Sequence, residues 1–306
     1  MNSRLFLGFA LLSLAACSSG APDEANDTLA AQDPIVGGTS DRGKDPAVVA
    51  IDIGGQGLCS GSLIGPRLVL TARHCVSETA EAVDCPANAP QVQGEHPADT
   101  FTILVGDDLR TARPVAIGKR VIVPPSDLLC DHDLALIELD RAVVGVTPLS
   151  LASLSGVKTV RGVGFGKRGD NTDAGKKMTR KNVPILAQSL AEFEVGVLSC
   201  SGDSGGPALD SNGRVVGVVS RGGPDCSGPN SRNIYTRVDQ FHALIDQALQ
   251  ASGSASTGGA NTGGANTSGA NTSGGASGSP AQCGPGKRCA NGSHCNTSTL
   301  LCEASS

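Results

Sequence analysis

The sequence predicts an all-β protein that ends in one helix, a flexible linker and a small Cys-rich module. Between about residues 35 and 238, short runs rich in Val, Ile and Leu alternate with Gly, Pro and Asp, as in "PAVVAIDI", "FTILVG" and "LALIELD". Such runs have the length, β-branched content and turn-type boundaries of strands. Because no long segment with the helical period interrupts them, the region suits a barrel or sandwich, or two of them.

Composition and charge narrow the class of protein. The 306 residues carry 24 basic and 29 acidic side chains, a formal net charge of −5. No basic run typical of nucleic-acid binding occurs, so DNA and RNA are not expected partners. The 11 cysteines indicate an oxidising compartment, where disulfides persist.

The N-terminus predicts export. Arg4 precedes an apolar run, 5–16, that is too short to span a bilayer comfortably, and small residues lead up to Cys17. The end of this run, "LAAC", resembles the bacterial lipobox. The resemblance implies that residues 1–17 are a lipoprotein-type signal peptide and that Cys17 is lipidated, which would leave ten cysteines, an even number. Residues 18–34 are small, polar and acidic, and we interpret them as a tether or propeptide.

Two locations follow from the two ways of processing this signal. With a lipid on Cys17, the chain is expected in the bacterial cell envelope, at the outer membrane or surface, with the lipid as its only membrane attachment. With an ordinary signal peptide cut nearby and Cys17 discarded, the protein is secreted.

One helix is predicted at the end of the β region. In "DQFHALIDQALQ" the apolar residues recur at i, i+3, i+4, i+7 and i+8, which places them on one helical face. This face is expected to pack against the β core. The helix completes the predicted main domain, residues 35–250.

The C-terminal part is predicted to contain two further segments. Residues 251–280 repeat Gly, Ala, Asn, Thr and Ser, which cannot bury a core and indicate a flexible linker. Residues 281–306 hold four cysteines, so a small module with two disulfides is expected. Three pairings are possible; our hypothesis is Cys283–Cys295 and Cys289–Cys302.

The stretch "CSGDSGGPAL" contains a candidate nucleophile, Ser204, among glycines and one acid. A serine hydroxyl needs a base to remove its proton, and histidine serves best near neutral pH. The candidate base is His74 in "LVLTARHCV", which follows an apolar strand. Cys59 lies sixteen residues before Cys75, and a disulfide between them would give the histidine a rigid mount.

A carboxylate behind the histidine would fix its tautomer. The candidate is Asp133 in "CDHDLALIEL", at the head of an apolar strand. Asp131 would point to the same face of an extended segment, so spacing alone leaves the choice open. With no further ligands at suitable spacing around Asp131 and Asp133, neither a metal ion nor a cofactor is expected.

Four motifs together resemble the trypsin/chymotrypsin-like serine protease family. They are "IVGG" at 35–38, "TARHC" at 71–75, "DLAL" at 133–136 and "GDSGGP" at 202–207, and His, Asp and Ser occur in the order typical of that family. The resemblance covers roughly residues 35–250. It implies two six-stranded antiparallel β-barrels with a C-terminal helix and a serine endopeptidase that acts on polypeptide substrates.

The resemblance also implies the role of each residue. His74 is general base and then general acid, Asp133 orients it, and Ser204 attacks the scissile carbonyl to form an acyl-enzyme. The amides of Gly202 and Ser204 form the oxyanion hole. The "GVGFG" stretch, 162–166, is similar to the glycine turn that begins the second barrel in the family.

Activation in this family depends on a new N-terminus. Cleavage before Ile35 would free an ammonium that pairs with Asp203 and shapes the oxyanion loop. Since Pro34 stands where the family usually has Arg or Lys, we expect another protease, or a different route, to process the chain.

Three disulfides are expected in the β region. Cys59–Cys75 lies beside the histidine, and Cys200–Cys226 matches a family disulfide that walls the specificity pocket. Cys85 and Cys130 match no family pair and are paired by elimination.

The resemblance places the specificity pocket as well. Leu198, six residues before the nucleophile, forms its floor, Asn233 takes a position often occupied by Gly, and Ser220 and Gly222 match a segment that pairs with substrate backbone. A Leu floor and an Asn wall predict a shallow pocket for small or medium uncharged side chains. Arg221 stands where the family usually has Trp.

A second hypothesis is a catalytically silent homologue that binds partners through the protease fold or the Cys-rich tail. Three features favour this second hypothesis: Pro34 precedes the expected cleavage point, the chain has no Trp, and Arg73 stands where the family usually has a small residue. The intact set of catalytic motifs favours the enzyme.

Overall fold

The first barrel is built from the Val/Ile/Leu-rich runs. Six antiparallel strands close in the order β2-β3-β4-β9-β8-β7. Their bounds are β2 (Val48–Ile53), β3 (Gly57–Gly65), β4 (Leu68–Thr71), β7 (Phe101–Val105), β8 (Arg113–Ile122) and β9 (Ala135–Leu139). All of β4 and β9 is buried, because side chains on both strands fill the barrel or the space next to it.

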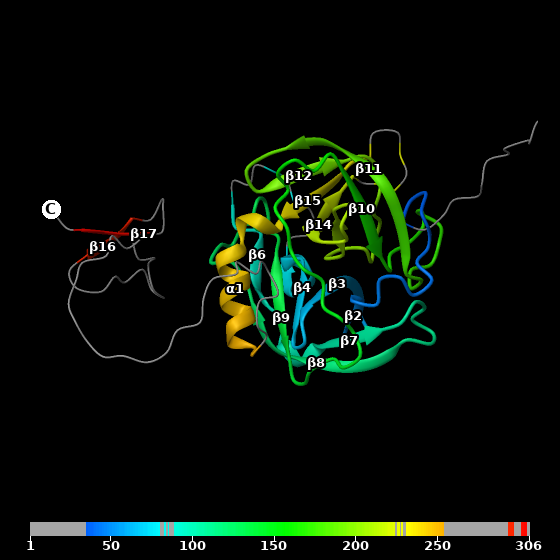
Figure 1. Cartoon of the computed structure of the whole chain (residues 1–306), viewed down its shortest axis with the longest axis horizontal. Coiled ribbons are helices and arrows are strands. Elements are labelled where there is room, and N and C mark those ends of the chain that lie inside the picture. The colour runs from blue at the N-terminus through cyan, green and yellow to red at the C-terminus, as the bar shows by residue number, and fades with distance from the viewer. Residues whose placement is uncertain are drawn as a thin grey trace, which may run out of the picture. The chain divides into compact units, whose positions relative to one another are not determined.

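The second barrel closes through a pairing between β11 and β12. Its strands run in the order β11-β10-β13-β14-β15-β12, and β1 (Thr39–Ser40) is added at the outer side of β11. Their bounds are β10 (Thr159–Gly164), β11 (Met178–Gln188), β12 (Glu192–Val195), β13 (Pro207–Leu209), β14 (Val215–Gly222) and β15 (Asn233–Arg237). The prediction of two six-stranded antiparallel barrels is therefore confirmed, and Figure 1 shows one above the other.

The predicted helix is α1 (His242–Ala251), and it follows the second barrel in sequence but packs on the first. Its apolar face, with Ile245, Ala248 and Leu249 buried, belongs to the same hydrophobic cluster as the first barrel's strands. In Figure 1, α1 lies along β9. The helix thus ties the end of the second barrel back to the first.

Short elements complete the main unit. They are the 3₁₀ helices η1 (Arg73–Cys75), η2 (Ala98–Thr100) and η3 (Val238–Gln240) and the two-stranded sheet of β5 (Ser77–Thr79) and β6 (Val92–Glu95). The helix η1 matters most here, because it carries the candidate base directly after β4.

The computed structural model describes residues 35–79, 83, 85, 89–223, 225–226, 228, 231–253, 293–296 and 301–304. The predictions for the signal peptide, the tether, the lipid on Cys17 and most of the linker lie outside these residues. Within the described part of the chain, no helix is both long and apolar enough to cross a membrane.

The chain divides into two units, Met1–Gly258 and Gly259–Ser306. In the second, β16 (Ser293–Asn296) and β17 (Leu301–Ala304) form an antiparallel hairpin that sets Cys295 opposite Cys302. Cys283 and Cys289 lie outside the described residues, so the pairing proposed for the tail stays a prediction.

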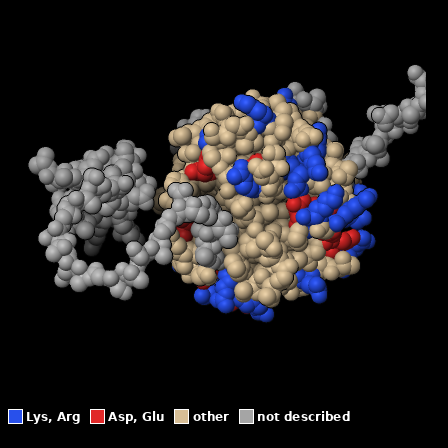
Figure 2. Space-filling view, in the orientation of Figure 1, with Lys and Arg blue, Asp and Glu red and all other residues tan. Residues whose placement is uncertain are grey.

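Charges of both signs share the surface of the main unit. On the face in Figure 2, Lys and Arg gather toward one edge with Asp and Glu beside them. Exposed pairs such as Arg110–Asp108 and Arg141–Asp140 compensate positive charge locally. Local pairing weakens the long-range field that attracts a polyanion.

Candidate active site

The His74 side chain stands on a rigid mount. It sits in η1, one residue before Cys75, which is joined by a disulfide to Cys59 on β3. Arg73, only 3% exposed, donates from its guanidinium to the main-chain carbonyls of Pro124 and Ser126 and pairs with Glu95. The arginine that the sequence marked as unusual is therefore a buried anchor for the turn that carries His74.

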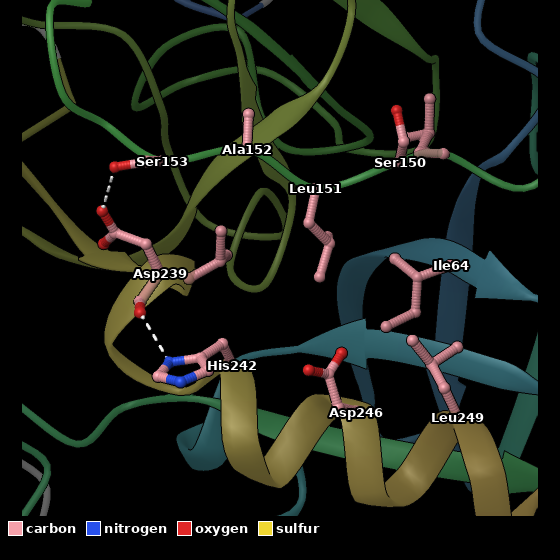
Figure 3. A pocket seen from close by; sticks show the side chains of 11 residues that line it. Ile64, Ser150, Leu151, Ala152, Ser153, Asp239, His242, Asp246 and Leu249 are labelled. Carbon is pink, nitrogen blue, oxygen red and sulfur yellow. Dashed lines mark hydrogen bonds between the residues drawn. The ribbon is translucent and has the colours of Figure 1, made fainter. Parts of the chain in front are cut away.

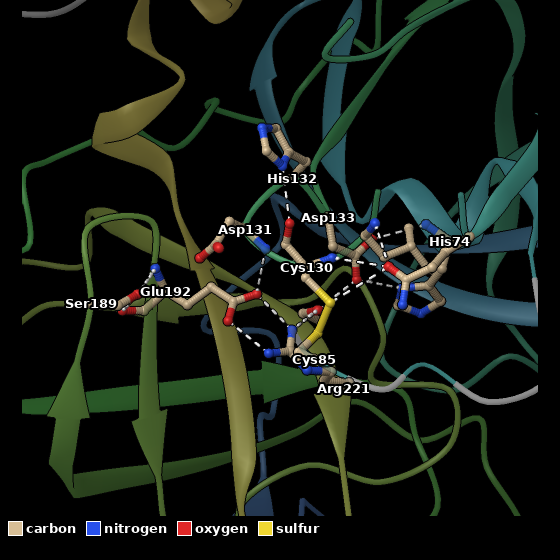
Figure 4. A network of polar contacts seen from close by, with 12 residues as sticks. His74, Cys85, Cys130, Asp131, His132, Asp133, Ser189, Glu192 and Arg221 are labelled. Atoms are coloured by element: carbon tan, nitrogen blue, oxygen red, sulfur yellow. Dashed lines mark hydrogen bonds and ion pairs between the residues drawn. A yellow bond between two sulfur atoms is a disulfide. The ribbon is translucent and has the colours of Figure 1, made fainter. Parts of the chain in front are cut away.

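Asp133 holds this histidine. Its Oδ2 lies 2.8 Å from the His74 Nδ1, and its Oδ1 accepts the His74 main-chain N–H at 3.0 Å. The Ser220 hydroxyl donates to the same Oδ2 at 2.6 Å. The acid in contact with the histidine is thus Asp133, the one that the resemblance implied, whereas Asp131 is exposed and has positive φ (Figure 4).

His74 and Asp133 shift each other's pKa values. Burial opposes charge on the imidazole, but the Asp133 carboxylate outweighs it, so the pKa of His74 is raised above its ordinary value. Burial likewise disfavours the carboxylate, but the neighbouring imidazole and the Ser220 hydroxyl lower the pKa of Asp133. This arrangement keeps the acid ionised and makes the histidine a better proton acceptor.

Ser204 is placed next to the segment that precedes His74. Its carbonyl accepts the main-chain N–H of Ser60 at 2.8 Å. A Cβ atom on the following residue, Gly205, would lie 2.0 Å from the Thr71 hydroxyl oxygen, so only glycine permits this approach. Among the described residues, no hydrogen bond joins the His74 ring to the Ser204 hydroxyl, and the ring Nε2 lies 4.0 Å from the Cys75 sulfur.

The loop before the serine presents two amides without acceptors. Neither the Gly202 nor the Ser204 main-chain N–H donates a hydrogen bond within the described ranges. Gly202 has φ +98°, a conformation that residues with a side chain rarely adopt. Two free donors on one turn are what a developing oxyanion requires.

Asp203 is buried behind this loop, and in the described part of the chain it forms no ion pair with a cation. Its Oδ1 accepts the Gly166 N–H at 2.7 Å and its Oδ2 the Cys200 N–H at 3.0 Å. Burial raises its pKa to about 7, although these two hydrogen bonds oppose the shift. Ile35 is also buried, but among the described residues no hydrogen bond or ion pair joins it to Asp203. In the continuous chain, the Ile35 nitrogen is an amide that carries no charge.

The predicted pocket residues differ in burial, because Leu198 and Asn233 are buried and Gly222 is exposed. Leu198 is fully buried, and a Cβ atom on Gly162 would lie 2.9 Å from its side chain, so Leu198 fills the second barrel's core. Asn233, also buried, accepts the Leu198 and Ser199 amides at its Oδ1, at 2.6 and 2.9 Å, and donates to the Ser199 carbonyl. The Asn side chain therefore locks β15 to the segment that leads to the nucleophile, while Gly222 at the end of β14 is exposed.

An ion pair near Asp133 was not predicted from the sequence. The Arg221 guanidinium forms two hydrogen bonds to the Glu192 carboxylate, at 2.6 and 2.7 Å (Figure 4). Glu192, on β12 of the second barrel, also accepts the Asp131 N–H at 3.0 Å. Sequence reasoning singled out Arg221, but its partner lies 29 residues away without any motif.

Disulfides join Cys59 to Cys75, Cys85 to Cys130 and Cys200 to Cys226, the same pairs as expected. The sulfurs of the first pair and a His74 ring nitrogen lie within 4.8 Å of one another, a separation that would suit a metal ion. Since a disulfide sulfur is not the thiolate that binds zinc, this cluster does not offer a metal site.

A separate cavity of about 450 Å³ lies between α1 and the segment before the second barrel (Figure 3). Ile64, Leu151, His242, Asp246 and Leu249 are among the residues that line it. None of the predicted site residues takes part, so this hollow is distinct from the candidate active site.

The two closed antiparallel barrels bring an imidazole–carboxylate pair close to a glycine-rich loop that carries a serine. This combination of fold and side chains defines the class of serine proteases that are built from two β-barrels. The trypsin family profile matches residues 35–245, and the chain belongs to the trypsin family.

Similar proteins include two from snake venom. The chain is 32% identical over 208 residues to snake venom serine protease 3 of Craspedocephalus gramineus, covering 60% of this chain and 74% of that protein. It is 28% identical over 251 residues to the protein C activator of Agkistrodon contortrix contortrix, covering 72% of this chain and 99% of that protein.

A mammalian relative is much longer. The suppressor of tumorigenicity 14 protein homolog of Bos taurus is 27% identical over 248 residues, which is 70% of this chain but 28% of that protein. The similarity to this relative therefore concerns one part of its length.

Proposed function

We propose that this chain is a serine endopeptidase in which Ser204, His74 and Asp133 carry out acyl transfer. The observation that carries the proposal is the Asp133–His74 pair, 2.8 Å apart, beside a serine loop with two free amides. In the first step the Ser204 oxygen bonds to the scissile carbonyl carbon while His74 Nε2 takes the serine proton. The imidazolium then gives this proton to the departing amine, and water repeats the sequence to release the acyl group.

The oxyanion hole consists of the Gly202 and Ser204 amides. Both face no competing acceptor in the described part of the chain, so they are available when the carbonyl oxygen becomes negative. Loss of one such donor typically costs about 10²–10³ in rate.

The preferred substrate has a small or medium uncharged side chain before the scissile bond. Asn233 supports this proposal, because three hydrogen bonds hold the side chain that is expected to form the pocket wall. No carboxylate stands at position 198 to select Arg or Lys.

Activation is proposed to follow cleavage before Ile35. A new ammonium there would give the buried Asp203 a cation partner, and none of the described residues supplies one in the continuous chain. Since Pro34 precedes the cleavage point, a second protease or a different route is expected to make the cut.

The remaining proposals concern location and domain limits. The chain is exported and attached to the envelope through a lipid on Cys17, or is secreted if the signal is cut without lipidation. A protease domain, 35–250, is followed by a linker, 251–280, and a disulfide-rich module, 281–306.

A fluorophosphonate probe tests the function. The full-length exported protein is expected to label at Ser204, and Ser204→Ala is expected to abolish the labelling. Mass spectrometry of the mature N-terminus, in the same preparation, reports lipidation at Cys17 and cleavage before Ile35. A correctly cleaved protein that does not label would contradict the enzyme and favour the catalytically silent homologue.

A further inference from the structure

A buried serine on the first barrel contacts the oxyanion loop of the second. Ser60 lies on β3, and none of its surface is exposed. Its hydroxyl donates to the Gly202 carbonyl at 2.9 Å and accepts the Phe165 N–H at 3.0 Å. Its main-chain N–H donates to the Ser204 carbonyl at 2.8 Å. One residue therefore binds the loop on both sides of Asp203.

The bond to Gly202 fixes a particular peptide plane. The Gly202–Asp203 peptide separates the two amides that face no acceptor, those of Gly202 and Ser204. The carbonyl of this peptide, on Gly202, accepts the Ser60 hydroxyl. The N–H of the same peptide, on Asp203, donates to the Cys200 carbonyl at 2.9 Å. Because both edges of this peptide are bound, it cannot rotate without the loss of two hydrogen bonds, and the angle between the flanking amides is fixed.

The direction of the hydroxyl proton follows from its neighbours. A hydroxyl has one proton to donate and two lone pairs that accept. The Phe165 N–H can only donate, so it takes a lone pair of the Ser60 oxygen and leaves the serine proton for the Gly202 carbonyl. Alanine at this position would remove the partner of the buried Phe165 amide and of the half-buried Gly202 carbonyl.

We propose that Ser60 is a positioning residue that holds the oxyanion hole in its productive shape. The proposal rests on the proposed endopeptidase function. The loop of the second barrel stabilises the transition state, and the Ser60 hydroxyl gives the first barrel a share in this effect because it holds that loop. The substrate itself does not contact Ser60, since the side chain is enclosed.

Ser60→Ala tests the proposal, with Ser62→Ala as the matched control. Ser62 is buried on the same strand, and within the described residues no hydrogen bond joins it to the oxyanion loop. Hydrolysis of a peptide p-nitroanilide ending in Ala is measured, with kcat referred to the sites that a fluorophosphonate titrates. Ser60→Ala is expected to lower kcat about 10-fold to 100-fold, with KM changed less than about twofold, because the hole is displaced and not removed.

A second readout separates positioning from folding. A peptidyl boronic acid forms a tetrahedral adduct whose oxygen uses the oxyanion hole, so its affinity for Ser60→Ala should fall by the same factor as kcat. Ser62→Ala should keep both values, and thermal unfolding should show a cooperative transition for both variants.

Three results would overturn the inference. If the wild type is active and Ser60→Ala keeps the wild-type kcat and boronic acid affinity, Ser60 has no positioning role, while the proposed function still stands. A Ser60→Ala variant without titratable sites or a melting transition would make Ser60 a folding residue. A wild type that neither labels nor hydrolyses peptides would overturn the proposed function, and the role of Ser60 with it.

Discussion

Asp133 holds His74 at two points, with Oδ2 2.8 Å from the ring Nδ1 and Oδ1 3.0 Å from the main-chain nitrogen. One contact fixes the ring and the other fixes the backbone that carries it. The ring is thereby held with Nδ1 toward the acid, which leaves Nε2 as the nitrogen available to Ser204. The tautomer follows from this contact, since an ionised carboxylate can only accept.

Asp133→Asn should lower kcat about 10⁴-fold while the fold is retained. The amide can donate to Nδ1, which puts the proton on Nε2 and removes the base. Asp131→Asn is the matched control, because that side chain is exposed, and its kcat should equal the wild-type value. Steady-state kinetics of both variants checks this. Equal losses in the two would contradict the assignment of the acid.

The pH dependence of kcat/KM should reflect the raised pKa of His74. Burial alone would lower that pKa, and the Asp133 carboxylate reverses the effect. Since only the neutral imidazole accepts the serine proton, activity should rise with pH, with its midpoint above the ordinary histidine value of about 6.5. A midpoint below that value, measured with a neutral substrate, would show that Asp133 does not dominate.

The contribution of Asp203 to the stability of the uncleaved chain should fall as pH rises from about 4 to about 7. The pKa of buried Asp203 is raised to about 7, so in this window the folded chain binds a proton that the unfolded chain has released. Asp203→Asn removes this contribution to the free energy of unfolding, which is about 1.4 kcal/mol for each tenfold difference in proton affinity between the folded and unfolded states.

Urea denaturation of the uncleaved wild type and of Asp203→Asn at two pH values checks the sign. The stability of the wild type relative to the variant should be lower at pH about 7.5 than at about 4.5. Asp41, whose pKa burial raises to about 6, affects both proteins equally and cancels in the difference. No change in the difference would contradict a raised pKa for the buried Asp203 carboxyl group.

Glu192→Gln should destabilise the fold by about 1–3 kcal/mol. The change leaves the Arg221 guanidinium, which is 23% exposed, without its anion and weakens the contact to the Asp131 amide. Because that amide lies two residues before the catalytic acid, kcat should fall as well. Arg141→Gln, in a pair whose arginine is 65% exposed, is the control and should change stability by less than about 0.5 kcal/mol. Equal losses of stability in the two variants, measured by chemical denaturation, would contradict a stabilising role for the Arg221–Glu192 pair.

Asn233→Gly should widen substrate preference toward larger side chains. The substitution removes the side chain expected to form the wall of the predicted pocket, together with its three hydrogen bonds. The ratio of kcat/KM for a Phe-ended over an Ala-ended peptide should rise about 10-fold or more, the range that pocket size changes typically give. An unchanged ratio would place the selectivity elsewhere.

The strands of the first barrel were predictable, and those of the second were less so. The runs "FTILVG" and "LALIELD" coincide with β7 and β9, because both are apolar and bounded by turn residues. In contrast, β11 contains Arg, Lys, Asn and Pro, and it is a strand through its pairing with β10 and β12. Tertiary pairing outweighs local propensity there.

The glycine stretch at 162–166 was only partly understood from sequence. It was expected to be a turn, but Gly162 and Gly164 lie within β10. Gly164 and Gly166 are required because a Cβ atom there would lie 2.2 Å and 2.5 Å from the Asp203 carboxyl group. The reason for these glycines is a residue nearly forty positions away, which local patterns do not reveal.

The sequence by itself determined the all-β class, the C-terminal helix and the types of group available for acyl transfer, because periodicity and motif chemistry are local. The resemblance implied Asp133 and not Asp131 as the partner of His74, but only the tertiary structure shows the 2.8 Å contact between these residues, 59 positions apart. Only the tertiary structure shows that Ser60 bonds to Gly202 and that Arg221 pairs with Glu192. Distances between side chains on different strands depend on barrel closure, so no local pattern can fix them.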